Sequence, residues 1–330
     1  MAIARPSVKS GSVLVWAARA ARRELFGYRF DYPVEAVRSA SLPGSLHYHV
    51  ASDVLWLDNL DVDASGVAMK RYRVHGYQYN PLFVAWWGLV HLQRHLRRPD
   101  QKSLDTFLTQ VRWLRSRAVE RADGAIVWPC HFDWQEGWCR LRAPWISAMY
   151  QGVVISALIR AYRMTGDREL VALCEAGARV FEETVEAGGV RTVERGKVLY
   201  EEYPGYPLAR VLDGFLFSLL GLHDLYAETG NGRWRERFNE GVAGLVANLD
   251  YWDYRGKWSW YGSHGYLCPP HYHKLNYLLL SILGELTGEE ALTRRARSWD
   301  LKGKGRLDKI EIYLVYLITQ NVARIRLPRQ

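Results

Sequence analysis

The sequence lacks the short motifs of several large enzyme classes and contains few cysteines. Cys130, Cys139, Cys174 and Cys268 stand at irregular intervals without a Cys-x-x-Cys pair, so no common zinc-ligand spacing is present and reduced core cysteines are expected. There is no P-loop, no Gly-x-Gly-x-x-Gly after a strand, no His-Glu-x-x-His and no Gly-x-Ser-x-Gly. These absences argue against nucleotide-dependent, zinc-protease and serine-hydrolase chemistry, and we expect neither a cofactor nor a metal.

Long hydrophobic runs are also missing. No stretch reaches about 18 apolar residues, so no transmembrane segment is expected. Residues 13–26 (VLVWAARAARRELF) resemble a targeting element but are interrupted by arginines and lack a small-residue cleavage site. They predict an amphipathic helix within residues 1–28 that packs on the domain or a second subunit, or lies on a membrane surface. Without a signal or an anchor, a cytoplasmic location is expected.

Aromatic and basic residues are abundant in this chain of 330 residues. Aromatic residues make up 13% and include 14 Trp and 20 Tyr. Aromatic rings fill cores, but their apolar faces also stack against sugar rings. The formal net charge of +9 attracts nucleic acid, anionic membranes or acidic polysaccharides. Because no nucleic-acid-binding motif accompanies this charge, no nucleic-acid partner is expected.

Hydrophobic patterning divides the chain into an arm and a helical part. Alternating residues in 29–75, with a polar turn at 61–66, predict a small β-hairpin arm. The paired acids of this turn resemble part of a calcium loop, but no Glu occupies the closing position. From residue 76 to residue 330 the pattern is helical and repeats.

The repeat is marked by similar helix ends. Stops of the type Thr-Gly-Asp or Pro-Asp fall at Asp100, Asp167, Asn231 and Glu289, which are 67, 64 and 58 residues apart. Such a period holds two helices, so the fold class predicted is mainly α, an incomplete α/α toroid of helix pairs preceded by a short helix and the arm. Polar and aromatic residues near the starts of successive inner helices are expected to ring a cleft: Tyr79, Trp145, Tyr150, Gln151, Arg210, Asp213, His273 and Asn276.

Tyrosines beside ionisable residues suggest acid/base chemistry. Residues 200–204 (YEEYP) place Tyr203 next to Glu202, and Tyr261 and Tyr272 follow about sixty residues later. A tyrosine has a reference pKa of about 10, so a site that uses it as a base must contain cations that lower the pKa. Candidate cations are Arg140, Arg210, His264, His271, His273 and Lys274.

Several of these stretches occur together in one known family. The sequence resembles the heparosan (heparan) D-glucuronyl C5-epimerases over roughly residues 75–285, in 75–81 (HGYQYNP), 85–91 (AWWGLVH), 144–152 (PWISAMYQG), 200–204 (YEEYP), 211–215 (VLDGF) and 272–273 (YH). The PW-SAM-QG and YEEYP blocks are the most specific.

The resemblance implies cofactor-free inversion at C5 of glucuronate to iduronate within an acidic, heparosan-like polymer. It implies that Tyr203, Tyr261 and Tyr272 transfer the protons, with Glu202 beside Tyr203, and it points to a homodimer. Substrate-binding residues are predicted at Tyr77, Tyr79, Arg140, Trp145, Tyr150, Gln151, His264, His273, Lys274 and Asn276.

The chain departs from the family at several points. Animal members carry a membrane anchor and a longer N-terminal region. They also place an Arg between the last two tyrosines, where this chain has Tyr261-Gly-Ser-His264, and a second His where Asn276 stands. Since the reaction needs a cation for the substrate carboxylate, His264 is the nearest replacement, followed by His273 and Lys274.

Other activities fit the residues as well. Toroids also host glycoside hydrolases with two carboxylates, for which Asp133, Glu136, Glu201, Glu202 and Asp213 are candidates. A polysaccharide lyase would share the first half of the epimerase reaction. A binding protein for acidic glycans would need the aromatics and cations without proton transfer.

Overall fold

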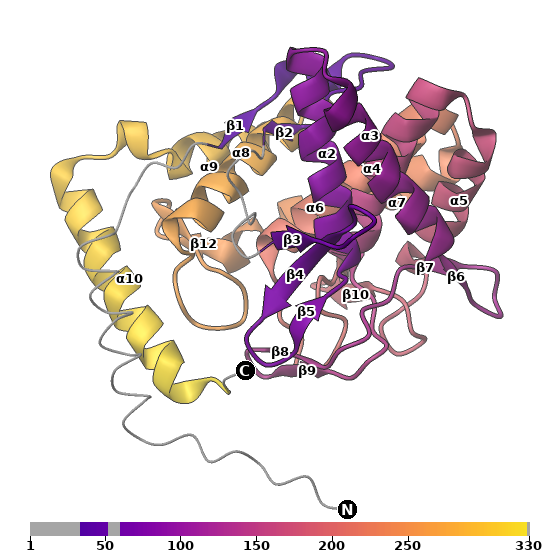
Figure 1. Ribbon diagram of the computed structural model, residues 1–330. Coiled ribbons are helices and arrows are strands. Elements are labelled where there is room, and N and C mark those ends of the chain that lie inside the picture. The colour runs from indigo at the N-terminus through magenta and orange to yellow at the C-terminus, as the bar shows by residue number, and fades with distance from the viewer. Residues whose placement is uncertain (1–33, 52–59, 329–330) are drawn as a thin grey trace, which may run out of the picture.

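Four helix pairs form the body of the protein (Figure 1). The computed structural model describes residues 34–51 and 60–328. The predicted helix within 1–28 and parts of the predicted arm, residues 29–33 and 52–59, lie outside these ranges. The pairs are α2 (Pro81–Arg97) with α3 (Gln101–Ser116), α4 (Ala148–Thr165) with α5 (Arg168–Ala178), α6 (Leu212–Thr229) with α7 (Gly232–Asn248), and α8 (Pro270–Thr287) with α9 (Glu290–Trp299).

The first helix of each pair belongs to an inner row. Helix α4 packs between α2 and α6, and α6 packs between α4 and α8, while each second helix covers its partner from outside. Helices α4 and α6 are almost entirely buried, whereas α3, α5, α7 and α9 bury one face. This arrangement confirms the mainly helical, incomplete α/α toroid. None of the described helices is long and apolar enough to cross a lipid bilayer.

The helix ends lie where the repeated stops predict them. Gly166, Gly230 and Gly288 follow α4, α6 and α8 in the left-handed conformation, with φ of 75°, 64° and 74°. Asp100 and Asp167 accept hydrogen bonds from backbone N–H groups in the first turns of α3 and α5. Local capping chemistry therefore sets the boundaries of the helix pairs.

Two glycines allow the central inner helices to approach closely. A Cβ on Gly221 of α6 would lie 2.3 Å from the Cα of Gly152 of α4, and one on Gly152 would lie 2.8 Å from the Cα of Ser218. Any larger side chain at either position would force the two helices apart.

Short antiparallel hairpins connect or precede the helices. Strand β1 (Glu35–Ala36) pairs with β2 (Val50–Ala51), and β3 (Leu60–Val62), β4 (Ala68–Tyr72) and β5 (Gly76–Gln78) form a three-stranded sheet. The other pairs are β6 (Val119–Glu120) with β7 (Ile126–Val127), β8 (Trp134–Glu136) with β9 (Cys139–Leu141), β10 (Arg191–Glu194) with β11 (Lys197–Tyr200), and β12 (Asp253–Tyr254) with β13 (Trp258–Ser259). Short 3-10 helices occupy Arg38–Ser41, Arg179–Phe181, Leu249–Trp252 and Leu301–Gly303.

The polar turn of the arm is closed by its own residues. Asp63 Oδ1 accepts hydrogen bonds from the backbone N–H groups of Ser65 and Val67, both at 2.9 Å. The Tyr79 hydroxyl donates to Asp63 Oδ2 at 2.6 Å. These bonds satisfy the carboxylate within the protein.

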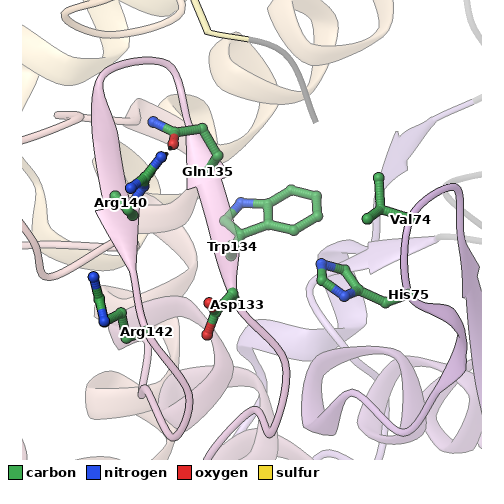
Figure 2. A pocket seen from close by; sticks show the side chains of 7 residues that line it. All are labelled: Val74, His75, Asp133, Trp134, Gln135, Arg140 and Arg142. Atoms are coloured by element: carbon green, nitrogen blue, oxygen red, sulfur yellow. Dashed lines mark hydrogen bonds between the residues drawn. The ribbon is translucent and has the colours of Figure 1, made fainter. Parts of the chain in front are cut away.

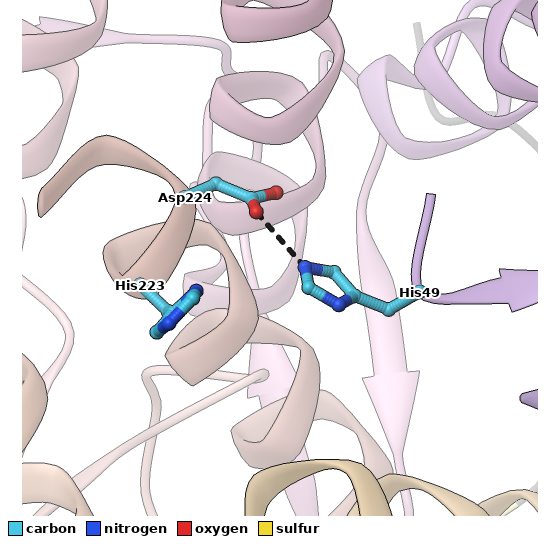
Figure 3. A group of neighbouring side chains, drawn as sticks. All are labelled: His49, His223 and Asp224. Atoms are coloured by element: carbon cyan, nitrogen blue, oxygen red, sulfur yellow. Dashed lines mark hydrogen bonds and ion pairs between the residues drawn. The ribbon is translucent and has the colours of Figure 1, made fainter. Parts of the chain in front are cut away.

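A buried ionic network fastens the segment around β2 to the helices. His49 Nε2 lies 2.9 Å from Asp224 Oδ1 of α6 (Figure 3). Arg160 Nη1 of α4 donates to Asp224 Oδ2 at 2.6 Å. Arg160 also donates to the carbonyl oxygen of His47 through Nε and Nη2, at 3.1 and 2.9 Å. Asp224 thereby joins three segments of the chain.

The same carboxylate belongs to the one group with metal-ligand spacing among residues 34–51 and 60–328, namely His49, His223 and Asp224. Arg160 already neutralises Asp224, so a divalent ion there would face a buried guanidinium next to its only anionic ligand. We therefore interpret this cluster as structural.

The last helix, α10 (Arg306–Arg326), runs along one side of the molecule (Figure 1). Lys257 Nζ lies 2.7 Å from Asp308 and 2.5 Å from Glu311 near its start. In the second half of α10, Thr319 Oγ1 accepts a hydrogen bond from the backbone N–H of Leu267, and Gln320 Nε2 donates to the carbonyl oxygen of Leu267. A stripe of exposed aliphatic side chains follows the outer face of this helix: Leu307, Ile310, Leu314, Ile318, Val322 and Ile325.

Candidate active site

The N-terminal ends of the four inner helices converge on one cavity. It has a volume of about 370 Å³ and is closed on one side by strand β4. Its walls are formed by Lys70, Arg71, Tyr72, Arg73, Leu82, Phe83, Trp86, Trp134, Met149, Tyr150, Glu202, Tyr203, Asp213, Tyr261 and Tyr272. All four predicted catalytic residues therefore line the same cavity. Because helix N-termini carry partial positive charge, this end of the toroid suits an anionic ligand.

The two glutamates of residues 200–204 have different surroundings. Glu201 is held by Arg210, whose Nη1 lies 2.8 Å from Oε1, and by Thr192 Oγ1 at 3.2 Å. Its backbone carbonyl accepts from the N–H of Ala148 at the start of α4. Glu201 thus fixes the loop, while Glu202 turns into the cavity.

Glu202 and Asp213 form a buried carboxylate pair. Their side chains are almost fully buried, and Glu202 Oε2 and Asp213 Oδ1 have no hydrogen-bond partner. Burial and the neighbouring charge of Asp213 raise the pKa of Glu202 well above its usual range, although the Tyr203 hydroxyl opposes this. Burial also raises the pKa of Asp213 to about 7. A carboxyl group with a pKa near neutrality can both accept and release a proton.

The tyrosines form a second cluster in the cavity. Tyr261 lies beside Tyr272 and Tyr266, with ring centroids 5.6 and 5.2 Å apart. Burial, with Glu202 and Glu136 nearby, raises the pKa of Tyr203 well above its usual range, and burial with Glu136 does the same for Tyr261. These hydroxyls therefore keep their protons at neutral pH and can donate them.

His264 lies behind the cavity wall. Its Nε2 is 3.1 Å from Glu136 Oε1, and its ring packs 5.0 Å from the ring of Tyr261. The left-handed Gly137 makes room for it, since a Cβ there would come within 2.6 Å of the imidazole. His264 is placed to orient Tyr261 and Glu136 rather than to contact a ligand in the cavity.

Cations on strand β4 and directly after it line the cavity instead. Lys70, Arg71 and Arg73 belong to its wall, and Lys70 Nζ lies 4.7 Å above the ring of Phe83. The sequence analysis missed these three residues. The alternation of 70–74 (KRYRV) indicates a strand, but nothing in it reveals that this strand faces Tyr203 and Tyr272.

The predicted ligand-binding residues are placed in three ways. Tyr150 lines the cavity, and Arg140 lies in the neighbouring one. Trp145 lies beneath Tyr150 and Tyr203, at ring distances of 5.6 and 6.1 Å. The others lie away from the cavity wall: Tyr77, Tyr79, Gln151, His264, His273, Lys274 and Asn276.

Two of these residues have evident structural contacts. Gln151 is buried and bonds to Trp128 N, Ile126 O and Gly177 O. His273 stacks on Trp258 at 3.6 Å, and burial lowers its pKa to about 3. His273 is therefore neutral at physiological pH and offers no charge to a carboxylate.

Fold and cavity define a class: a toroid of helix pairs with a cavity at the inner helix ends, lined by tyrosines, buried carboxyl groups and the cations of the arm. The family described as "D-glucuronyl C5-epimerase C-terminus" matches residues 122–301, and the chain belongs to this family. A curated relative, the D-glucuronyl C5-epimerase of Caenorhabditis elegans, is 29% identical over 226 residues, which cover 63% of this chain and 36% of the relative. The chain thus spans about a third of that relative's length.

Solved structures of similar outline come from other carbohydrate enzymes. The match to a GH76 α-mannanase of Bacteroides thetaiotaomicron covers 81% of this chain and 77% of the mannanase chain, with 13% identity and a TM-score of 0.46. A cellobiose 2-epimerase of Bacillus thermoamylovorans covers 86% and 71%, with 13% identity and a TM-score of 0.48. These values are too low to support any argument about function.

Proposed function

We propose that this protein epimerises D-glucuronate to L-iduronate at C5 within an acidic, heparosan-like glycan. The observation that carries the proposal is the convergence of Tyr203, Tyr261, Tyr272 and Glu202 on one cavity in a chain of the C5-epimerase family. Two tyrosine groups from separate loops can serve the two faces of a sugar ring, as inversion requires.

The reaction removes a weakly acidic hydrogen. Breaking the C5–H bond leaves negative charge on a carbon next to a carboxylate that is already anionic, so electrostatic stabilisation must be large. The helix N-termini and the side chains of Lys70, Arg71 and Arg73 supply positive charge at the cavity wall. We assign the binding of the substrate carboxylate, here called the carboxylate clamp, to Lys70, Arg71 and Arg73 in place of His264.

Proton transfer is assigned to Tyr203 with Glu202. As the Tyr203 oxygen takes the C5 proton, the proton of its hydroxyl moves to the Glu202 carboxylate. Tyr261 or Tyr272 then donates its proton to C5 from the opposite face, and the tyrosinate left behind regains a proton from the Glu202–Asp213 pair. The raised pKa of Asp213, about 7, favours this exchange because this carboxyl group can bind and release a proton near neutrality.

The test is deuterium incorporation. Heparosan and N-sulfated heparosan are incubated with the protein in D2O with EDTA and without nucleotide, and C5 is followed by NMR. Deuterium at C5 with unchanged chain length is expected. Absence of exchange in every uronate polymer would reject the proposal.

A glycoside hydrolase or polysaccharide lyase is the second candidate. The pair Glu202 and Asp213 favours it, because glycosidases use two carboxyl groups, one of them with a raised pKa. New reducing ends would identify hydrolysis, and absorbance at 232 nm would identify the unsaturated product of a lyase.

We also propose that the protein is a cytoplasmic homodimer. The aliphatic stripe on α10 supports an interface, because extended exposed apolar surfaces usually mark association sites. Light scattering should give twice the 38.1 kDa chain mass, and Leu314→Lys should shift it toward the monomer. A single 38.1 kDa species at micromolar concentration would contradict the dimer.

A further inference from the structure

A second cavity adjoins the candidate active site. It has a volume of about 410 Å³ and lies between the turn after β4 and the hairpin of β8 and β9. Its lining consists of Val74, His75, Asp133, Trp134, Gln135, Arg140 and Arg142 (Figure 2). Trp134 lines both cavities, and Arg73 of the first is followed directly by Val74 of the second.

We propose that this second cavity is a subsite for sugars beside the reacting uronate, and that it recognises an anionic group there, either the carboxylate of the next uronate along the glycan or a sulfate on the adjacent glucosamine. The inference rests on the proposed function, since it assigns a glycan to the adjoining cavity. It makes the hairpin of β8 and β9 a specificity element of this chain.

The charges of the cavity favour an anion. Arg140 and Arg142 extend from the β9 side, and His75 faces them from the other side (Figure 2). Arg140 Nε donates to Gln135 Oε1 at 3.2 Å, an uncharged partner. Among the ion pairs of residues 34–51 and 60–328, none involves Arg140 or Arg142. Two exposed guanidinium groups without a counterion form a suitable receptor for a planar carboxylate or a sulfate.

The single acid in the lining has a structural contact. Asp133 Oδ1 accepts a hydrogen bond from the backbone N–H of Ala143 at 2.9 Å. This bond ties the two ends of the hairpin together, so Asp133 holds the segment on which Arg140 and Arg142 stand. The positive side chains therefore outnumber the acid in the lining.

Trp134 supplies an aromatic wall between the two cavities. Its indole is half-buried, and its ring projects toward Val74 and His75 (Figure 2). The edge-on ring of Tyr72 at 5.5 Å and the hydrogen bond from Trp134 Nε1 to Glu136 Oε2 at 3.3 Å keep it in place. An aromatic face of this kind packs against a sugar ring while the arginines bind the charged substituent.

The experiment compares two double variants of equal net charge. In R140Q/R142Q the receptor is neutralised; in R112Q/R297Q two exposed arginines on α3 and α9 are replaced instead. Binding of heparosan and N-sulfated heparosan tetrasaccharides is measured by calorimetry, and C5 exchange is measured separately. R140Q/R142Q should bind roughly ten-fold or more weakly and raise KM by a similar factor with little change in kcat, whereas the control should match the wild type.

The outcomes separate the two proposals. Weaker binding of both tetrasaccharides identifies a carboxylate as the recognised group, and weaker binding of the sulfated one alone identifies a sulfate. Equal binding by wild type and R140Q/R142Q, or an equal loss in the control, overturns the subsite. Tetrasaccharide binding that depends on Arg140 and Arg142 without any C5 exchange would keep the subsite and reject the epimerase.

Discussion

Helix α6 carries two buried aspartates with opposite electrostatic environments. Asp213 stands in its first turn and Asp224 about three turns later, and both are almost fully excluded from solvent. Asp224 is bonded to Arg160 and His49, which hold its pKa well below the usual range despite burial. At Asp213 burial dominates and raises the pKa to about 7.

The two aspartates differ in the groups that surround their buried charge. At Asp224 the buried charge is compensated, so the carboxylate serves as a structural junction. Asp213 lies beside Glu202 at the end of the toroid that also holds Tyr203, Tyr261 and Tyr272, and one oxygen of each carboxyl group has no hydrogen-bond partner among the described residues. Burying carboxyl oxygens without hydrogen-bond partners, as at Glu202 Oε2 and Asp213 Oδ1, is costly, and such costs are concentrated at functional sites.

The largest expected effect is on turnover at the Asp213 end. Tyr203→Phe and Tyr272→Phe keep the ring packing and remove only the proton carrier, so each should lower kcat by about a hundred- to ten-thousand-fold with the fold intact. The matched control is Tyr200→Phe, whose hydroxyl donates to the carbonyl of Arg237 away from the cavity, at 2.7 Å. Near-full activity of both Tyr203→Phe and Tyr272→Phe would make these tyrosines core residues only.

Breaking the Asp224 junction should affect stability instead. Arg160→Met leaves a buried carboxylate without its cation and should lower the free energy of unfolding by about 3–5 kcal/mol. Urea unfolding measures the loss, and the activity per folded molecule should stay close to that of the wild type. A change below about 1 kcal/mol would show that Asp224 is stabilised by other groups.

Neutralising Asp213 should raise the free energy of unfolding, whereas Arg160→Met should lower it. The folded pKa of Asp213, about 7, exceeds its ordinary value of 3.8, so the folded state binds the proton more tightly than the unfolded chain does. The wild type therefore loses stability as pH rises from about 4 to 7. Asp213→Asn removes this loss and should be more stable than the wild type at pH 8 by at least about 1 kcal/mol, with a smaller advantage at pH 5. Equal pH profiles of the two melting temperatures would contradict the raised pKa.

The smallest expected effects are changes in KM, which should differ between Lys70 in the cavity lining and His264 outside it. Lys70→Met should raise KM for the uronate substrate by roughly ten-fold, and Lys70→Arg should restore most of the affinity. His264→Asn should change KM little, because His264 pairs with Glu136 outside the cavity lining. The reverse ranking would return the carboxylate clamp to His264.

The sequence could predict features that depend on neighbouring residues. The helix ends follow from glycine and Asx caps, and Tyr203, Glu202 and Asp213 follow from the YEEYP and VLDGF blocks. Features that depend on long-range packing could not be read from it. His273 resembles a ligand beside Tyr272, yet its position on α8 stacks it on Trp258 in the core. The role of Lys70 depends on how the arm lies across the inner helices.

The buried junction at Asp224 also bears on the order in which the molecule can form during synthesis. His49 and Asp224 are separated by 175 residues, and the cavity draws its walls from Lys70 to Tyr272. As the chain leaves the ribosome, the arm emerges first but has no complete anchorage until α6 has followed, and the cavity stays open until α8 arrives. Such distant pairing is slow to form and leaves apolar surface exposed meanwhile, so fragments that end before α8 should be aggregation-prone and inactive.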